Sequence, residues 1–293
     1  MNIIERFRPD PIATIHPMPE YLATGRRAKW YEDTKQVLQV PWMGVVTMAY
    51  AHYPTFFGEL WRGLKPLCQS RHFVERFREL RDYVETRAAE LNPTPLVGPL
   101  KALGYSPREI DAIRQINTVF SHGNQLYVLI ATVTTHLLEI GDLQGKADAE
   151  PFEGRHSPDV HVPFVLMEPH HVDEPTRAVY EDIKSVLRLP FVNTDYRAFA
   201  RWPSYFAMAW NDLREKAGTP AHEAICQACH DRAANWVAAE LPNPGSLSAH
   251  SLRRAAEADA GLEEVIQVCR LFQWLLPGLI TNIAYFRHQL EAV

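Results

Sequence analysis

The chain has 293 residues, of which 46% are hydrophobic and 22% charged, and its formal net charge is −5. These are values of a globular protein, so extensive disorder is excluded, and the length is enough for one large or two ordinary domains. No basic run marks a nucleic-acid surface, and no stretch of about 20 residues is apolar enough to cross a bilayer. The first residues lack the apolar core of a signal peptide, and four cysteines are too few for a disulfide framework. We therefore expect a cytoplasmic protein without nucleic-acid or membrane partners.

Two segments of the chain repeat one another. Residues 31–64 align without a gap to residues 180–213 at an offset of 149, and thirteen of the 34 aligned positions are identical. We therefore predict a first repeat over residues 1–140 and a second over residues 176–293. The intervening residues 141–175 are rich in Pro, Gly, His and charged residues, a composition typical of a connector.

The spacing of apolar residues predicts that both repeats are helical. In the first, steps of alternating three and four residues predict one long helix over residues 113–137. In the second, a helix with Asp173 as its N-cap and Pro175 in its first turn is expected to end at Pro190.

A further helix is expected from about Asn193 to Trp202, and Pro203 opens the next one. Sustained alternation of apolar and polar residues, bounded by hairpin turns, is found nowhere, so strands have little support. The predicted fold class is all-α, with two pseudo-symmetric helical repeats packed into one body.

One acidic residue differs in chemical type between the two copies. Asp195 shares a helical face with Ala198, Phe199 and Trp202, whereas its counterpart in the first copy is Val46. Burial among apolar groups raises the pKa of a carboxyl group, which suits a general base or a nucleophile. The alternative is that Asp195 stabilises the first turn of its helix, where Asp is common.

Thr55 and Glu59 lie at positions i and i+4 of the helix that Pro54 opens, so their side chains project together. Glu59 lies beside the apolar face of this helix and near Arg62. The pattern alone therefore favours a surface ion pair over a catalytic carboxylate at Glu59.

Two asparagines flank the apolar stripe of the long predicted helix. Asn117 and Asn124 are seven residues apart, and Tyr127 follows one turn after Asn124. A buried Asn needs partners for its donors and its acceptor, so it orients a water or a ligand carboxylate, or it makes an ordinary interhelical hydrogen bond. Both interpretations stay open.

The CQACH run at 226–230 matches the pattern of covalent haem attachment, but that attachment needs an exported protein. Cys226 and Cys229 also raise the alternative of a thiol redox enzyme of the alkylhydroperoxidase-D type, although Ala233 stands where those enzymes have a histidine. A zinc site would need two more ligands, and the spacing provides none.

The doubled pattern, with VPW and YPTFFGELW in one half and LPF-x-N-T-D-Y-R-x-F in the other, resembles the group I (DL-type) 2-haloacid dehalogenases. That family is unrelated to the α/β haloacid dehalogenase superfamily. The resemblance implies an all-α homodimer, an active site between the two halves, and neither metal nor cofactor. The implied reaction replaces the halogen of a short 2-haloalkanoic acid with a hydroxyl group and inverts C2.

Carried over by motif, the resemblance identifies Asp195 as the general base and Thr55 and Glu59 as further essential residues. Asn124 and Tyr127 match an Asn-x-x-Tyr pair of the pocket, with Asn117 as the alternative asparagine. In the expected reaction, Asp195 takes a proton from a water held by Asn124, and this water attacks C2 without a covalent ester. The alternative of an aspartyl ester intermediate stays open.

Four further residues match pocket-wall positions of the family: Trp42, Val45, Asn193 and Thr194. Val45 stands where the family leads us to expect phenylalanine, and Asn193 stands where members that accept both enantiomers have a small residue. The bulk of Asn193 therefore predicts a preference for the D-substrate. A second alternative function is a helical protein that binds small carboxylates without turnover.

Overall fold

The computed structural model describes residues 3–291. Within this range the chain is all-α, with no strand and a single isolated β-bridge between Ser70 and Pro151. None of the described helices combines the length and the apolar character that crossing a membrane requires. The helices of the first part of the chain are η1 (Glu20–Leu22), α1 (Gly25–Leu38), α2 (Val45–Tyr50), α3 (Pro54–Cys68), α4 (Arg71–Ala88), η2 (Ala89–Leu91), α5 (Val97–Ala102) and α6 (Pro107–Glu139). Those of the second part are α7 (Glu174–Leu187), α8 (Thr194–Phe199), α9 (Pro203–Arg214), α10 (Pro220–Ala239), α11 (Ala249–Asp259) and α12 (Leu262–Gln289).

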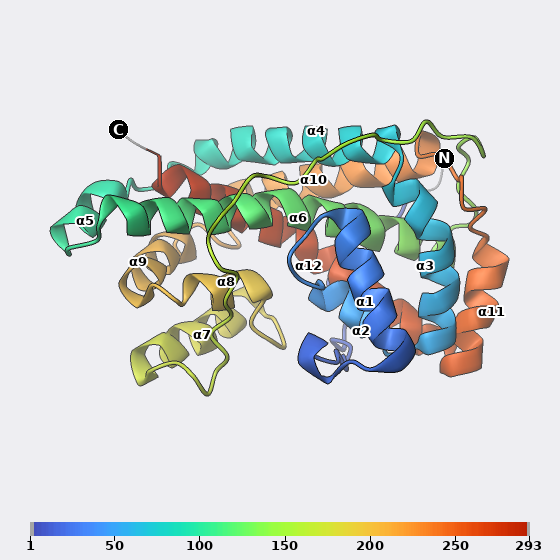
Figure 1. Ribbon diagram of the computed structural model, residues 1–293, viewed down its shortest axis with the longest axis horizontal. Coiled ribbons are helices and arrows are strands. Elements are labelled where there is room, and N and C mark those ends of the chain that lie inside the picture. The colour runs from blue at the N-terminus through green and yellow to red at the C-terminus, as the bar shows by residue number, and fades with distance from the viewer. Residues whose placement is uncertain (1–2, 292–293) are drawn as a thin grey trace. The chain divides into compact units, whose positions relative to one another are not determined.

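The described chain divides into two compact units, each of which contains segments from both sequence halves. Unit 1 comprises residues 3–80, 123–157 and 228–277, and unit 2 comprises residues 81–122, 158–227 and 278–291. In unit 1, α3 packs against α1, α2 and α11, and in unit 2, α9 packs against α7 and α8 (Figure 1). The predicted boundaries of the repeats stay a prediction.

The long predicted helix is confirmed as α6, which extends beyond the apolar stripe at both ends. Ser106 and Glu109 explain its start, because they form a capping box. The Ser106 N–H donates to Glu109 Oε2 over 2.9 Å, and the Glu109 N–H donates to Ser106 Oγ over 3.2 Å. Pro107 follows as the first helical residue, where a missing N–H costs nothing. From Val119 to Leu138 every residue is buried.

The helices around Asp195 begin and end largely as their local sequence predicts. The Thr176 N–H donates to the Asp173 carboxylate over 3.0 Å, which confirms the predicted N-cap of α7. The helix after Pro190 is shorter than predicted, because α8 ends at Phe199. Trp202 takes a non-helical backbone conformation (φ −119°, ψ 80°), as expected for the residue before Pro203.

Local structure agrees between several segments at the sequence offset of 149. Helices α7 and α8 begin and end 149 residues after α1 and α2 respectively. Both α1 and α7 end on a left-handed residue, Gln39 with φ 52° and Arg188 with φ 55°. These are similarities of local conformation, and the packing of the two halves as pseudo-symmetric repeats stays a prediction.

Side-chain hydrogen bonds repeat at the same offset. The indole N–H of Trp61 donates to Asp33, and that of Trp210 donates to Asp182, each over 2.8 Å. Residues 141–173, in turn, form no helix, as their composition predicts.

Candidate active site

Asp195 lies in the first turn of α8 in unit 2, and its residue surface is only 2% exposed. The other residues on its helical face, Ala198, Phe199 and Trp202, are buried as well. The carboxyl group therefore lies in the protein interior rather than in bulk solvent. A buried carboxyl group on an apolar face is costly to maintain unless its surroundings or its chemistry require it.

The residues that precede Asp195 are buried without forming a side-chain cap. Asn193 is the N-cap residue of α8, but its side chain accepts no N–H of the helix. Its Oδ1 is buried and has no hydrogen-bond partner among the described residues. Thr194 Oγ1 accepts a hydrogen bond from Arg197 over 3.3 Å. Asn193 therefore has an acceptor that helix capping does not use.

Residues 167–168 form hydrogen bonds to α8. The Arg197 guanidinium donates to Glu168 over 2.6 Å, and the Met167 N–H donates to the Arg197 carbonyl over 3.0 Å. The Tyr180 hydroxyl donates to the Met167 carbonyl over 2.7 Å. These bonds fix the helix that carries Asp195 relative to α7 and residues 167–168.

A chain of buried hydrogen bonds also connects α8 to α12 and α10. Asn282 Nδ2 donates to the Tyr196 hydroxyl over 2.9 Å, and Asn282 Oδ1 lies 2.8 Å from His222 Nε2. Burial raises the pKa of Tyr196, so its hydroxyl stays protonated at neutral pH. Sequence reasoning missed His222 and Asn282, because their residue types alone do not show that they meet Tyr196.

In unit 1, Tyr127 organises the predicted pocket residue Trp42. The Tyr127 hydroxyl accepts from the Gly44 N–H over 2.9 Å and donates to the Trp42 carbonyl over 3.1 Å. The two rings meet edge to face with centroids 5.9 Å apart. Burial raises the pKa of Tyr127, which keeps its hydroxyl a donor. Tyr127 thus fixes the backbone that carries Trp42.

The indole of Trp42 lies directly on the backbone of α6. A Cβ atom added at Gly123 would lie 2.3 Å from Trp42 Cη2, which is closer than any real contact. Asn124, the next residue of α6, is buried, and Val45 at the start of α2 is half-buried. The structure therefore brings Trp42 and Tyr127 together, one turn of α6 from Asn124.

Thr55 and Glu59 lie in a different part of unit 1. They line an open depression of about 560 Å³ together with Arg26, Gly58, His250, Ser251, Arg254 and Ala255. The Glu59 side chain is 27% exposed and accepts two hydrogen bonds from Arg62, over 2.8 and 3.2 Å. This is the ion pair that the helical spacing favours.

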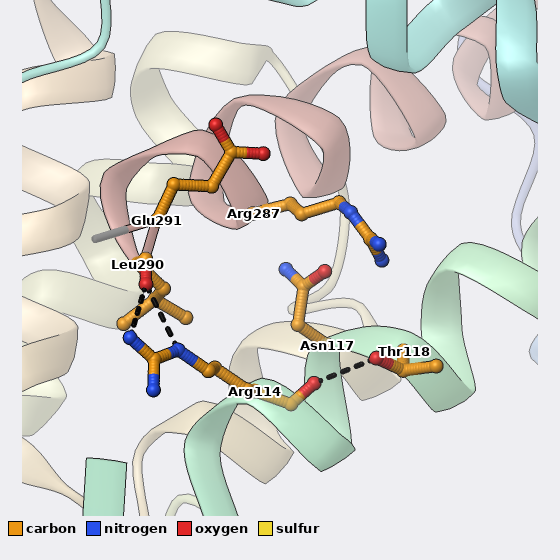
Figure 2. Close-up of a pocket in the computed structure, with 6 residues that line it drawn as sticks. All are labelled: Arg114, Asn117, Thr118, Arg287, Leu290 and Glu291. Atoms are coloured by element: carbon orange, nitrogen blue, oxygen red, sulfur yellow. Dashed lines mark hydrogen bonds between the residues drawn. The ribbon is translucent and has the colours of Figure 1, made fainter. Parts of the chain in front are cut away.

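Asn117 lines a pocket of about 450 Å³ in unit 2, at the ends of α6 and α12 (Figure 2). Its Nδ2 donates to the Ile283 carbonyl over 3.0 Å, and its buried Oδ1 has no partner among the described residues. Arg114, one turn before Asn117 on α6, donates to the Leu290 carbonyl on the facing wall of the pocket (Figure 2). Of the predicted site residues, Asn117 is the one that lines this pocket.

The cysteines of the CQACH run are buried and not in disulfides. The Cys226 sulfur lies 3.6 Å from His222 Nδ1, and the Glu223 carboxylate lies near both atoms. The i, i+4 spacing of His222 and Cys226, with Glu223 between them, is a sequence signal for this cluster that the C-x-x-C-H pattern does not include.

Comparison with known proteins identifies the family, although no family model matches the chain. The chain is 44% identical to an (R)-2-haloacid dehalogenase of Rhizobium sp. (strain NHG3) over 252 residues, covering 86% of this chain and 97% of that protein. It is 38% identical to an (R)-2-haloacid dehalogenase of Pseudomonas putida over 299 residues, covering 98% and 97%.

Two solved structures agree in fold over almost the whole chain. A D-2-haloacid dehalogenase mutant with D-2-CPA has a TM-score of 0.89 and 33% identity, covering 99% of both chains. A D-2-haloacid dehalogenase with L-LA has a TM-score of 0.89 and 34% identity, covering 99% of this chain and 100% of that one. Fold and sequence together define an all-α hydrolase that acts on carbon–halide bonds. The chain belongs to the group I 2-haloacid dehalogenase family.

Proposed function

We propose that the protein hydrolyses short 2-haloalkanoic acids to 2-hydroxyalkanoic acids with inversion at C2. The family of the chain supports the reaction type. The observation that carries the proposal is the burial of the Asp195 carboxyl group on an apolar helical face, where the related position of the first half has Val46.

In this reaction Asp195 acts as the general base. It takes a proton from water, the water oxygen attacks C2, and the halide leaves on the opposite side with the bonding electron pair. Asn124 is assigned to orient this water, which its amide and carbonyl groups can do together. A single turnover in heavy-oxygen water tests the direct route, because label entering Asp195 would instead indicate an aspartyl ester.

The D-configuration is the proposed substrate. Both curated relatives above are (R)-2-haloacid dehalogenases, and the bulk of the buried Asn193, two residues before Asp195, supports the same preference. The two solved relatives hold D-2-CPA, the chloropropionate, and L-LA, the lactate of opposite configuration. A substrate and a product of opposite configuration are what displacement from the rear side of C2 gives.

Halide release from the two enantiomers of 2-chloropropionate, assayed separately, tests the proposal. We expect the D-enantiomer to react about 100-fold faster, the discrimination that one well-placed contact supplies. The product from D-chloropropionate should be L-lactate. Equal rates would refute the assignment of Asn193, and release from neither enantiomer would refute the proposed function.

The remaining pocket residues have proposed roles that follow from their contacts. Trp42 and Val45 exclude bulk water from the alkyl and halogen groups, and Tyr127 holds the backbone of Trp42. Thr194 is proposed as a wall of the site beside Asp195.

Thr55 and Glu59 are proposed to act indirectly. Their depression is separate from the Trp42–Tyr127 contact, and Glu59 is already paired with Arg62. We infer that they stabilise α3 and its contact with α11 in unit 1.

The two alternative functions are less well supported. A thiol redox enzyme would need a reactive sulfur, and both Cys226 and Cys229 are 0% exposed. A carboxylate-binding protein without turnover would not need a buried acid at Asp195. We keep as proposals the homodimer, the position of the active site between the halves, and a reaction that needs neither metal nor cofactor.

A further inference from the structure

Three side chains with metal-binding atoms cluster at the start of α10 in unit 2. His222, Glu223 and Cys226 each offer one ligand atom, and these atoms all lie within 4.8 Å of one another. Positions i and i+4 of a helix lie on one face, so the His222 ring lies over the Cys226 sulfur. His222 and Cys226 are 3% and 0% exposed, whereas the Glu223 side chain is 49% exposed. The cluster is thus buried on one side and reachable through Glu223.

The distances fit a shared ion. Cys226 Sγ lies 3.6 Å from His222 Nδ1, and His222 Nδ1 lies 3.8 Å from Glu223 Oε1. In a tetrahedral zinc site, with bonds of about 2.3 Å to sulfur and 2.0–2.1 Å to nitrogen, neighbouring ligand atoms lie roughly 3.5 Å apart. The His–Cys pair therefore needs almost no movement to bind an ion, and the exposed Glu223 is able to rotate.

A hydrogen bond to the far nitrogen fixes the orientation of the His222 ring, as is usual for metal-binding histidines. Its Nε2 lies 2.8 Å from Asn282 Oδ1, and Asn282 is itself held by the Tyr196 hydroxyl. Such a partner on the far ring nitrogen selects the tautomer whose other nitrogen faces the ion. On the backbone, the Gly218 N–H also approaches Nδ1, at the long distance of 3.4 Å.

We propose that His222, Glu223 and Cys226 form a binding site for one Zn²⁺ ion. The mixed nitrogen, sulfur and oxygen set suits zinc and disfavours Mg²⁺ and Ca²⁺, which prefer oxygen ligands. A water completes the tetrahedron. On binding, the thiol loses its proton to solvent and the thiolate sulfur bonds to the ion, with no change in oxidation state. The ion links α10 to Asn282 of α12 and thereby to Tyr196 of α8.

Cobalt titration tests the site without relying on enzyme activity. The full-length reduced protein, stripped of metal with a chelator, is titrated with Co²⁺ under anaerobic conditions. We expect a thiolate-to-cobalt absorption band in the near ultraviolet that saturates at one ion per chain and that Zn²⁺ abolishes by displacement. Zn²⁺ should also raise the Tm of the wild-type protein.

Three variants separate the site from adventitious binding. Cys226→Ser should lose the band, whereas Cys68→Ser, which removes an equally buried thiol from unit 1, should keep it. Glu223→Gln changes an exposed side chain and leaves the fold intact, and should weaken Co²⁺ binding at least about tenfold. The absence of a saturable band in the wild type, a band that persists in Cys226→Ser, or unchanged affinity in Glu223→Gln would each overturn the proposal.

Discussion

The carboxyl group of Asp195 lies in the interior at a position where the first half of the chain carries an aliphatic side chain. This burial is what the role that we propose for Asp195 as a general base would require, because burial raises the pKa of a carboxyl group.

Replacing Asp195 by Asn tests this directly. Asn keeps the size and most of the polarity of the side chain but cannot take a proton, so halide release should fall by about 10³-fold. The helical circular dichroism should be unchanged. Asp231→Asn, which alters a half-exposed carboxylate on α10, is the control and should retain full activity. Near-normal turnover by Asp195→Asn would exclude this residue as the base.

At the scale of single residues, the sequence predicted which side chains are chemically unusual better than it predicted which side chains touch. The difference between Asp195 and Val46 in the two copies pointed to a buried acid. The pairing of Glu59 with Arg62 also followed from helical spacing. By contrast, nothing local indicates that Asn282 meets Tyr196, because residues 86 positions apart are brought together only by tertiary packing.

The N-caps of α1 and α7 allow a matched test at the scale of the element. Asp173 accepts a hydrogen bond from the Thr176 N–H, whereas Thr24, at the equivalent position, makes no side-chain cap. Asp173→Ala should therefore lower the free energy of unfolding by about 1 kcal/mol, and Thr24→Ala should leave it within about 0.3 kcal/mol of the wild type. Urea unfolding measures both values. Equal effects of the two substitutions would show that the capping bond is not what stabilises α7.

Contact between α6 and Trp42 gives a second test at this scale. Ala at Gly123 would place a Cβ atom 2.3 Å from the indole, so Gly123→Ala should cost about 1–3 kcal/mol of unfolding free energy. Gly98 of α5 has no atom within 4 Å of an added Cβ, and Gly98→Ala should instead stabilise by about 0.5–1 kcal/mol. If both variants unfolded at the same urea concentration, the close contact would not be rigid.

Helices were predictable where sequence signals are local. Asp173, Pro175 and Pro203 mark helix starts through backbone chemistry that acts within one turn. The early end of α8 at Phe199 was not foreseen, because a proline constrains only the residue before it and the last turn of a short helix depends on packing.

At the scale of the whole molecule, buried histidines make stability depend on pH. Burial, together with the charge of Arg78, lowers the pKa of His156 to about 4. Burial also lowers the pKa of His136 and His230. The unfolded chain therefore binds more protons than the folded protein once the pH drops below about 6.5.

The contribution of these three histidines to stability should thus be fully present above about pH 6.5 and should decrease as the pH falls towards 4. Urea midpoints between pH 7.5 and pH 4.5 measure this decrease. His156→Gln removes one of these titrating groups, so its midpoint should change less over the same interval. A midpoint that rises on acidification would contradict the assigned sign.

The all-α class and the family could be predicted from sequence, because helical periodicity extends over most of the chain and because residues 31–64 and 180–213 contain the family's motifs. The division of the chain into two compact units could not be predicted from the sequence. Each unit combines segments that are more than 40 residues apart, such as residues 3–80 and 123–157 of unit 1. Such a division depends on tertiary contacts that no local pattern encodes.

The indole of Trp42 fills the space in which any side chain at position 123 would lie. Neither position can therefore be varied independently of the other in protein engineering. Enlarging residue 123 alone would therefore destabilise the fold, and shortening the side chain of Trp42 alone would leave a cavity beside α6. Changing the two together, with Ala at 123 and a smaller ring at 42, would keep this contact filled while altering the residue that we propose as a wall of the substrate site.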